Sequence, residues 1–528
     1  MFYSVLFPTE ESAQKPRNQK APDCFSDLQL DRILKAVLPD YAQFDLEEFY
    51  YTPVTDPETV RYRQEVMREL AEPEKRAAME EIIRRITAAH ASLEGTRPKL
   101  LSLGILTGEK PKDNYLEMGR FLDALTDYLD AVNALNSGLI KLDLRSPGLR
   151  GFAAYLKSYC ASEKLRDMTE RWQRLKESIG RIRFNMFVKR GNFFLVAKPG
   201  SIRVTPYGGQ EDYALRITEL FSRFRQGESR SFFRSMSEKP RSEHIENQVL
   251  RMVSNLYPEE FWELRDFVRV YLDVEDATVL AFTREIQFYF AWLDMVKTME
   301  EIGFSFCYPQ LRGREEGRFA MDAYDLALAL RTLKPVAPSD FSLTPPEQIL
   351  VVTGPNRGGK STFARAFGQI FHLASLGVSI PARQAALPLC DQVLTHFERG
   401  EDELKQSGKL EEDLLRLKNL LDRATKDSVF AVSEIFSSTT PKDALALGGH
   451  MIDALSEKAG SAVVVTFMEE LSEVGPQTVS MVSEVSGDGE QRRSFRILRR
   501  KADGAADALK LAGRYGLTAE QIKRRVLG

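Results

Sequence analysis

The sequence has no apolar stretch approaching the roughly 18 residues that a membrane-spanning helix requires. Its amino terminus, MFYSVLFPTEES, also lacks the basic segment, the long apolar segment and the small-residue cleavage site of a secretory signal. Cysteine is scarce: the four cysteines lie far apart and form no CxxC pair, which argues against a disulfide framework or a zinc ribbon. We therefore expect a soluble, cytoplasmic protein with no membrane partner.

The chain also contains few histidines and has a net charge close to zero. The five histidines are scattered, with no His-x-x-x-His or His-Glu-x-x-His spacing, so a metal site other than one for Mg²⁺ is not expected. The chain has 73 Lys and Arg against 76 Asp and Glu, a formal net charge of -3. Any contact with nucleic acid must therefore come from a local basic patch, because the molecule carries no overall positive field.

The chain is long enough, at 528 residues, to form at least two domains. From about residue 25 to 303, apolar residues recur at three- and four-residue spacing, which predicts long helices. Asp56 as N-cap and Pro57 as first helical residue mark one helix start. A second long helical run covers 259–302, and its apolar face is broad enough to lie inside a bundle.

Two changes of pattern divide the chain. Residues 184–210 carry β-branched and aromatic residues between glycines and prolines, which predicts a small insert with strands. After the proline-rich residues 335–348, the apolar runs ILVVT, VFAV and AVVVT alternate with helical stretches, a pattern typical of a parallel α/β sheet. We predict an α plus α/β multidomain protein, helical over 1–303 and α/β over 304–528.

The strongest motif is GPNRGGKS, which matches the phosphate-loop pattern G-x-x-x-x-G-K-[ST]. An apolar strand at 349–353 precedes it and a helix follows, so an accidental glycine-rich turn is disfavoured. Backbone N–H groups can close around phosphates there, Lys360 can reach the β and γ oxygens, and the Ser361 hydroxyl can ligate Mg²⁺. The predicted nucleotide-binding residues are Gly354, Pro355, Asn356, Arg357, Gly358, Gly359, Lys360, Ser361 and Thr362.

An acidic element follows in VFAVSE, where a strand at 429–432 leads to Ser433 and Glu434. We expect this strand to neighbour the phosphate-loop strand. In phosphate-loop ATPases it usually ends in Asp-Glu: the Asp supports Mg²⁺ and the Glu orients or deprotonates the attacking water. Here Ser433 holds the Asp position. Glu434 is the candidate catalytic base, and the alternative is an ordinary exposed glutamate.

A Ser-Gly pair, Ser407 and Gly408, lies where the next helix begins. Such a helix start presents N–H groups that suit a γ-phosphate arriving from another subunit. The alternative is a common N-cap. The helix that follows is expected to bury an apolar stripe formed by Leu410, Leu414, Leu417 and Leu421.

For DNA, the best local patch interleaves basic residues with phenylalanines over 221–241, with further basic residues in the preceding insert. Such a cluster can hold phosphates; the alternative is a solvated helix with its phenylalanines facing the core. The predicted DNA-binding residues are Lys189, Arg190, Arg223 and Arg225.

Taken in order, these motifs resemble the MutS family of DNA mismatch-repair ATPases, a branch of the ABC-type ATPases. TGPNRGGKST is similar to the family's phosphate loop, SGKLEED occupies its signature position, and SEIFSSTTPKDA lies where the family has its Asp-Glu strand and D-loop. FYYTPVTDPETVRYRQEVMREL is similar to the start of its helical core and lever. FRILRRKADGAADALKLAGRYGLTAEQIKRRV resembles the end of its ATPase domain, where Thr518 and Gln521 suit a capping box.

The resemblance implies a core and lever domain over 1–303, with a clamp-like insert at about 183–241, and an ATPase domain over 304–528. It implies ATP and Mg²⁺ as ligands and a homodimer, or a heterodimer with a MutS-like partner. The phosphate loop of one subunit and Ser407-Gly408 of the other would enclose each nucleotide. Duplex, mismatched or branched DNA would pass through the clamp end.

Three positions depart from the family pattern. Ser433 replaces the Asp, Phe467 stands where a His contacts the γ-phosphate, and Val336 stands where an aromatic often stacks on adenine. The 350 or so residues before the phosphate loop read as core, without the family's Phe-x-Glu mismatch wedge. We therefore expect slow ATP hydrolysis. The alternatives are a non-hydrolysing ATP-dependent switch or structural partner, and a DNA-junction or recombination-control clamp.

Overall fold

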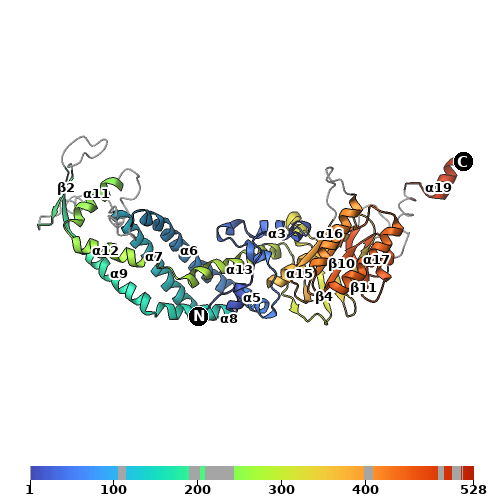
Figure 1. The fold of residues 1–528 in the computed structure, drawn as a ribbon, viewed down its shortest axis with the longest axis horizontal. Coiled ribbons are helices and arrows are strands. Elements are labelled where there is room, and N and C mark those ends of the chain that lie inside the picture. Colours follow the sequence, from blue (N-terminus) through green and yellow to red (C-terminus); the bar gives the residue numbers. More distant parts are fainter. Residues whose placement is uncertain are drawn as a thin grey trace. The chain divides into compact units, whose positions relative to one another are not determined.

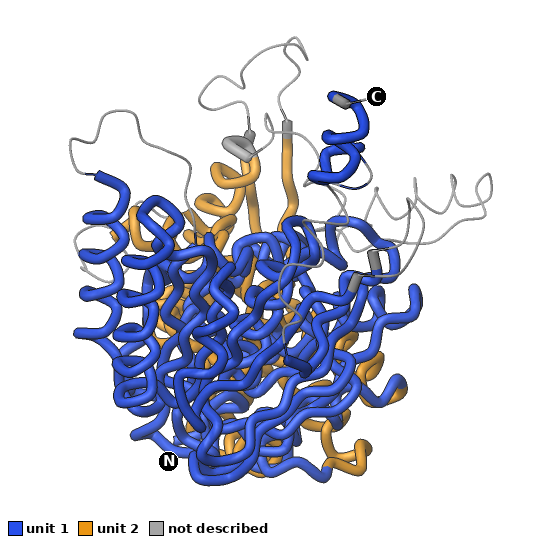
Figure 2. Tube along the Cα trace, turned by 90° about the vertical axis from the view of Figure 1, so that its right-hand side faces the viewer, with its two compact units in different colours: residues 1–73, 145–152, 284–528 blue, residues 74–144, 153–283 orange. Residues whose placement is uncertain are grey.

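The computed structural model describes residues 2–104, 114–188, 202–208, 243–397, 408–485, 493–501, 513 and 515–527. The chain divides into two compact units (Figure 2). The first unit contains Met1–Pro73, Arg145–Phe152 and Arg284–Gly528, and the second contains Glu74–Leu144 and Ala153–Thr283. None of the helices described is both long and apolar enough to cross a membrane. The boundary expected at residue 303 between family domains stays a prediction.

The second unit is built from helices and one β-hairpin. Its hairpin pairs β1 (Phe184–Val188) antiparallel to β2 (Ile202–Pro206), which confirms the strands predicted in the insert. Its helices are α6 (Pro73–Ser102), α7 (Tyr115–Lys141), α9 (Glu163–Arg181), α11 (Glu243–Ser254) and α12 (Pro258–Tyr271), and it shares α8 (Pro147–Cys160) and α13 (Ala277–Glu301) with the first unit.

The helical run expected over 259–302 is two helices, α12 and α13. The carboxylate of Asp276 accepts hydrogen bonds from the backbone N–H groups of Thr278 and Val279, both at 3.0 Å. An Asp in this position caps a helix start, so a new helix begins at Ala277. The predicted helical run is therefore confirmed, and the cap that divides it is not revealed by periodicity alone.

The amino-terminal part of the first unit is a series of short helices followed by a longer one. In α5 (Pro57–Leu70), Asp56 accepts from the N–H groups of Glu58 and Thr59, which confirms the predicted N-cap. The others are α1 (Glu10–Gln14), α2 (Cys24–Asp27), α3 (Leu30–Val37), the 3₁₀ helix η1 (Pro39–Phe44) and α4 (Glu47–Tyr51).

The main sheet of the first unit has six strands in the order β12-β11-β6-β10-β9-β8. All neighbouring pairs are parallel except β11 with β12, so the predicted parallel α/β sheet is confirmed. The strands are β6 (Ile349–Thr353), β8 (Val393–His396), β9 (Val429–Ser433), β10 (Ser461–Val465), β11 (Thr478–Val485) and β12 (Arg493–Arg499).

Helices cover this sheet because its central strands are apolar throughout. Every residue of β6, β9 and β10 is buried, the pattern of strands covered on both faces. Val351 and Val464 belong to a core cluster with α16 (Lys409–Arg423) and α17 (Pro441–Lys458). The helix α15 (Lys360–Leu376) packs on β9 and β10 and lies on the other side of the sheet from α17 (Figure 1).

A second sheet was not predicted. It has the order β3-β7-β4-β5, and its short strands mix polar and apolar residues too closely to stand out in the sequence.

At the carboxyl end, Thr518 and Gln521 exchange hydrogen bonds and confirm the predicted capping box. The remaining elements are β3 (Gln310–Leu311), β4 (Arg318–Ala323), α14 (Leu326–Thr332), β5 (Ser339–Leu343), β7 (Gln384–Leu387), the 3₁₀ helix η2 (Glu469–Glu473) and α19 (Ala519–Leu527).

The amino-terminal helices pack along α15. Gln369 Nε2 donates to Leu28 O at 2.8 Å, and His372 Nε2 lies 2.8 Å from Tyr50 O. A Cβ built on Gly368 would lie 2.6 Å from the Leu28 side chain, so a larger residue here would require that side chain to move. Burial lowers the pKa of His372 to about 4, which keeps the imidazole neutral at pH 7. The helix that follows the phosphate loop is therefore held along its length by a distant part of the chain.

Candidate nucleotide-binding site

The glycine-rich loop joins the carboxyl end of β6 to the amino end of α15, which confirms the predicted strand and helix on either side of it. Gly359 is the N-cap of α15, with φ of 90°, and no side chain caps this helix start. The first N–H groups of an uncapped helix are available to an anion. The loop therefore places backbone donors where the sequence expected phosphate oxygens.

Two glycines of the loop are required by their surroundings. A Cβ on Gly358 would lie 2.3 Å from Ser483 Oγ, and one on Gly359 would lie 2.9 Å from Phe495 O. The left-handed backbone of Gly359 also disfavours any residue with a Cβ. Packing against β11 and β12 thus explains these two glycines without reference to a ligand.

Lys360 is the first residue of α15 and is 4% exposed. Its Nζ donates to Gly354 O at 2.8 Å and to Pro355 O at 3.1 Å, so the side chain folds back into its own loop. The same Nζ lies 4.8 Å from the centroid of the Phe467 ring. Burial lowers the pKa of Lys360, and the carboxylate of Glu434 opposes this change. The Lys360 ammonium therefore contacts neutral groups, and the Glu434 carboxylate is near enough to affect its pKa.

The carboxyl end of β9, the acidic strand, also lies at the start of α15. Ser433, the last residue of β9, donates through Oγ to Ser361 Oγ at 3.1 Å. Glu434 follows with φ of 60°, a conformation that non-glycine residues rarely adopt, and its N–H donates to Val465 O at 3.0 Å. The structure thus brings Ser433 and Glu434 to the start of α15, where the phosphate-loop prediction needs them.

The order of the strands differs from the expectation. β9 was expected to neighbour β6, but β10 lies between them and pairs with both strands. That adjacency was wrong because strand order depends on how the crossover connections are wound, which no local pattern specifies. The side chains still meet because the carboxyl ends of parallel strands share one edge of the sheet.

Residues 350–521 match the sequence family described as MutS domain V. Over 187 residues the chain is 32% identical to the DNA mismatch repair protein MutS of Aquifex pyrophilus. The chain therefore contains a segment of the MutS domain V family. The match to the Aquifex protein covers 34% of this chain and 22% of that protein.

Longer matches to MutS proteins show lower identity. The DNA mismatch repair protein MutS of Pseudothermotoga lettingae is 22% identical over 244 residues, 46% of this chain and 30% of that protein. The corresponding protein of Streptococcus equi subsp. equi is 24% identical over 269 residues, 50% of this chain and 31% of that protein. The chain therefore spans between about a fifth and a third of the length of these relatives.

The MutS-type site has an apolar residue at the position where the resemblance expects histidine. Phe467 follows β10 and is 52% exposed, and its ring lies beside the Lys360 ammonium. Val336 is partly exposed in the turn between α14 and β5, and its role toward adenine stays a prediction. Lys360, Ser361, Ser433, Glu434 and Phe467 are therefore the predicted residues that the structure brings together.

The remaining predicted residues lie apart or outside the described part of the chain. Gly408 is the N-cap of α16, as predicted, and a Cβ on it would meet no atom within 4 Å. The apolar stripe of α16 is shifted: Leu417 and Leu420 are buried, whereas Leu414 is 38% exposed. Outside the described residues lie Ser407, Lys189, Arg190, Arg223 and Arg225.

Sequence reasoning missed Ser483, which supports the loop from β11. Its Oγ donates to Gly358 O at 2.7 Å, and the residue is 1% exposed. A serine inside the apolar strand segment MVSEV is a weak signal that one face of the strand meets a polar group. Nothing in the sequence indicates that this group is a carbonyl of the phosphate loop, which lies 125 residues away.

Proposed function

We propose that this chain is an ATP-binding and DNA-binding protein of the mismatch-repair type, and that it acts as a nucleotide-gated dimer with slow ATP hydrolysis. One observation carries the proposal: Lys360, Ser361 and Ser433 converge at the open amino end of α15. Such a convergence of a lysine, a hydroxyl and free helix N–H groups suits the β and γ phosphates of ATP. The mismatch-repair role is supported by the similarity to DNA mismatch repair proteins MutS.

In this proposal the loop residues bind the phosphates of ATP. The N–H groups at the start of α15 donate to phosphate oxygens, and Lys360 exchanges the carbonyls of Gly354 and Pro355 for them. A charged donor binds an oxyanion more strongly than it binds a neutral carbonyl, so the exchange favours the nucleotide. While Lys360 moves, the hydrogen bond from Ser483 to the Gly358 carbonyl holds the backbone of the loop in place.

The residues around Ser361 fit Mg²⁺. The Ser361 and Ser433 hydroxyls lie 3.1 Å apart, and Mg²⁺ accepts a single protein oxygen together with phosphate and water oxygens. We assign Ser361 as its protein ligand, and the bound ion would neutralise charge on the phosphates. Ser433 orients the Ser361 hydroxyl but carries no negative charge. The ion is therefore held less firmly than it would be beside an Asp.

Hydrolysis depends on Glu434, which we propose positions the attacking water. Its backbone is tied to β10 through the Val465 carbonyl, so the carboxylate stays near Lys360. Phe467 offers the transferring phosphate no hydrogen bond, and this lowers the rate that Glu434 can support. A non-hydrolysing ATP-dependent switch is the second candidate, favoured by the same two positions, Ser433 and Phe467.

The proposal extends to a second subunit and to DNA. Ser407 and Gly408 of one subunit would contact the γ-phosphate held by the other, in a homodimer or in a heterodimer with a MutS-like partner. The exposed and uncapped start of α16 at Gly408 supports this role. DNA would be held by the basic insert of a core and lever domain over 1–303, apart from the ATPase domain over 304–528.

Turnover measurements on variants of β9 separate the enzyme from the switch. We expect Ser433→Asp to raise the rate of ATP hydrolysis and to lower the Mg²⁺ concentration at half-maximal rate, because a carboxylate would then lie beside Ser361. Glu434→Ala should reduce any turnover to background. The matched control is Ser433→Ala, which removes the hydroxyl without adding charge. If Ser433→Asp and Glu434→Ala both leave turnover at the wild-type value, neither residue belongs to a catalytic site.

Phe467 should affect how readily the chain takes up ATP. Nucleotide binding must draw the Lys360 ammonium away from the Phe467 ring, and an exposed cation–π contact is worth about 0.5–1 kcal/mol. We expect Phe467→Ala to raise ATP affinity by about two- to fivefold, measured by titration with a fluorescent ATP analogue. Phe467→Leu, which keeps apolar bulk but has no ring, should behave in the same way. Weaker binding in both variants would mean that the ring contacts the nucleotide instead.

A further inference from the structure

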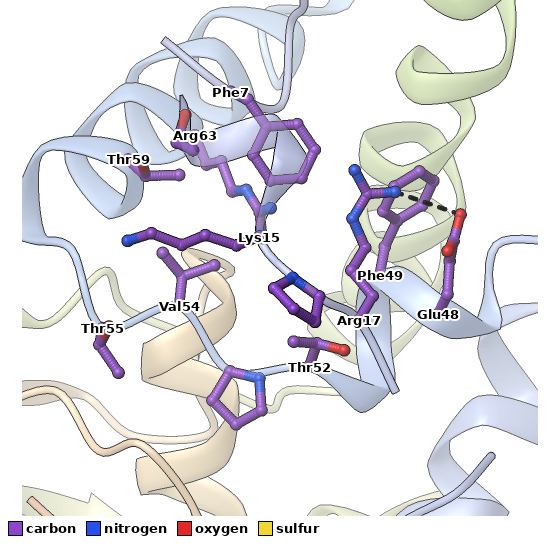
Figure 3. A pocket seen from close by; sticks show the side chains of 13 residues that line it. Phe7, Lys15, Arg17, Glu48, Phe49, Thr52, Val54, Thr55, Thr59 and Arg63 are labelled. Carbon is purple, nitrogen blue, oxygen red and sulfur yellow. Dashed lines mark hydrogen bonds and ion pairs between the residues drawn. The ribbon is translucent and has the colours of Figure 1, made fainter. Parts of the chain in front are cut away.

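A pocket in the amino-terminal part of the first unit brings together more positive than negative side chains (Figure 3). Its volume is about 270 Å³, and it lies between the first residues of the chain, the loop after α4 and the start of α5. Three cationic side chains line it, those of Lys15, Arg17 and Arg63, against one carboxylate, that of Glu48. The pocket belongs to neither the phosphate loop nor the acidic strand.

Arg63 is a buried cation with no carboxylate partner. It is 1% exposed, and it donates through Nε to Leu6 O and through Nη1 to Leu376 O, both at 3.0 Å. In the described part of the chain it forms no ion pair; its guanidinium lies over the rings of Phe7 and Phe288, and the carboxylate of Glu285 acts on it electrostatically. A buried guanidinium satisfied only by carbonyls is costly unless an anion approaches it.

The carboxylates around this pocket already have hydrogen-bond or ion-pair partners. Glu48 is shared by Arg17 at 3.3 Å and Arg284 at 2.9 Å. Asp56 caps α5, and Glu285 accepts from the Ser4 hydroxyl and the Val5 N–H. Burial raises the pKa of Glu285, which still acts electrostatically on Arg63 without forming a salt bridge to it.

Lys15 completes the positive side of the pocket. Its side chain is drawn in Figure 3 extending past Val54 toward Thr55 and Thr59. Within the described residues it makes no hydrogen bond and no ion pair, although Asp56 acts on it electrostatically. Neither this ammonium nor the Arg63 guanidinium forms a salt bridge in the described part of the chain, although Asp56 and Glu285 act on them electrostatically.

We propose that this pocket binds a small molecule in which a carboxylate is joined to a flat apolar group. The carboxylate lies between Arg63 and Lys15 and accepts from Nη2 of Arg63, because Nε and Nη1 already donate to the Leu6 and Leu376 carbonyls. Phe49 and Val54, which line the same pocket, contact the apolar group. The volume of about 270 Å³ is large enough for a single ring that carries a carboxylate. This site is additional to nucleotide binding and does not depend on it.

Benzoate is the probe for this site, and benzamide, of equal shape but uncharged, is its control. Binding to the full chain is followed without nucleotide, through the ¹⁹F line width of 4-fluorobenzoate and its displacement by each compound. We expect a dissociation constant in the millimolar range, because a ligand of about nine heavy atoms makes too few contacts to bind more tightly. Benzamide should bind at least tenfold more weakly. Equal binding of the two compounds, or no binding of benzoate, overturns the proposal.

Charge reversal at two exposed lysines, one in the pocket lining and one outside it, tests where the ligand binds. Lys15→Glu places a negative charge in the pocket and should weaken 4-fluorobenzoate binding by at least fivefold, whereas Lys20→Glu, outside the pocket lining, should leave it unchanged. Both changes are at exposed positions, so folding should not be affected. Binding that Lys15→Glu leaves unaltered would show that benzoate is held elsewhere and that the pocket is not its site.

Discussion

Replacing Lys360 with alanine is expected to lower ATP affinity by about tenfold or more. The change removes a charge-assisted contact to phosphate, worth about 1.5–3 kcal/mol, and each 1.4 kcal/mol or so is a factor of ten. In the described part of the chain the ammonium donates to the Gly354 and Pro355 carbonyls and lies beside one aromatic ring, and these neutral groups can be replaced by a phosphate oxygen. Titration of wild type and variant with a fluorescent ATP analogue at fixed Mg²⁺ measures the effect.

The control for this experiment must separate removal of the charge from disturbance of the loop. Lys360→Met keeps the aliphatic stem packed at the start of α15 and should reduce the affinity as much as alanine does. Lys418→Ala, at an exposed position of α16, should bind ATP as the wild type does. Wild-type nucleotide affinity in both Lys360 variants would reject the phosphate-loop assignment, whatever the strand and helix around it.

The second large effect is expected on DNA binding. Replacing Lys189, Arg190, Arg223 and Arg225 together with alanine should weaken binding to all duplexes alike, without changing ATP affinity. Phosphate contacts position a protein on DNA but do not read its sequence. Removing one phosphate contact should reduce the slope of log affinity against log salt by about 0.9, so removing four should change it by about 3.6. Filter binding across a salt series, with duplex, mismatched and branched DNA, measures both quantities.

The matched control removes the same number of charges elsewhere. Alanine at Lys35, Lys334, Lys418 and Lys426, all exposed, should leave the slope unchanged. The net charge of -3 gives no background attraction that could mask the difference. If the quadruple variant of the insert keeps the wild-type affinity and salt slope, the patch is a solvated helix face. The switch protein then becomes the better description of the chain.

Contiguous patterns in the sequence determined the elements of the candidate site. The apolar strand at 349–353, the glycine-rich loop and the helix that begins at Lys360 are adjacent in the chain, so spacing and residue type were enough to predict them. The strand that ends at Ser433 and the helix start at Gly408 were found for the same reason. The DNA-binding residues, the second subunit and the hydrolysis rate stay predictions.

The tertiary structure decided which side chains meet. It placed Phe467 beside Lys360, Ser483 behind the phosphate loop and β10 between the two strands of the site. It also joined residues 1–73 to 284–528 in one compact unit, so that Arg63 holds the end of α15 and lines a pocket. These contacts link residues up to more than 300 positions apart. Local periodicity records only which face of an element is apolar; the partner of that face is chosen by chain crossover and packing, which involve the whole fold.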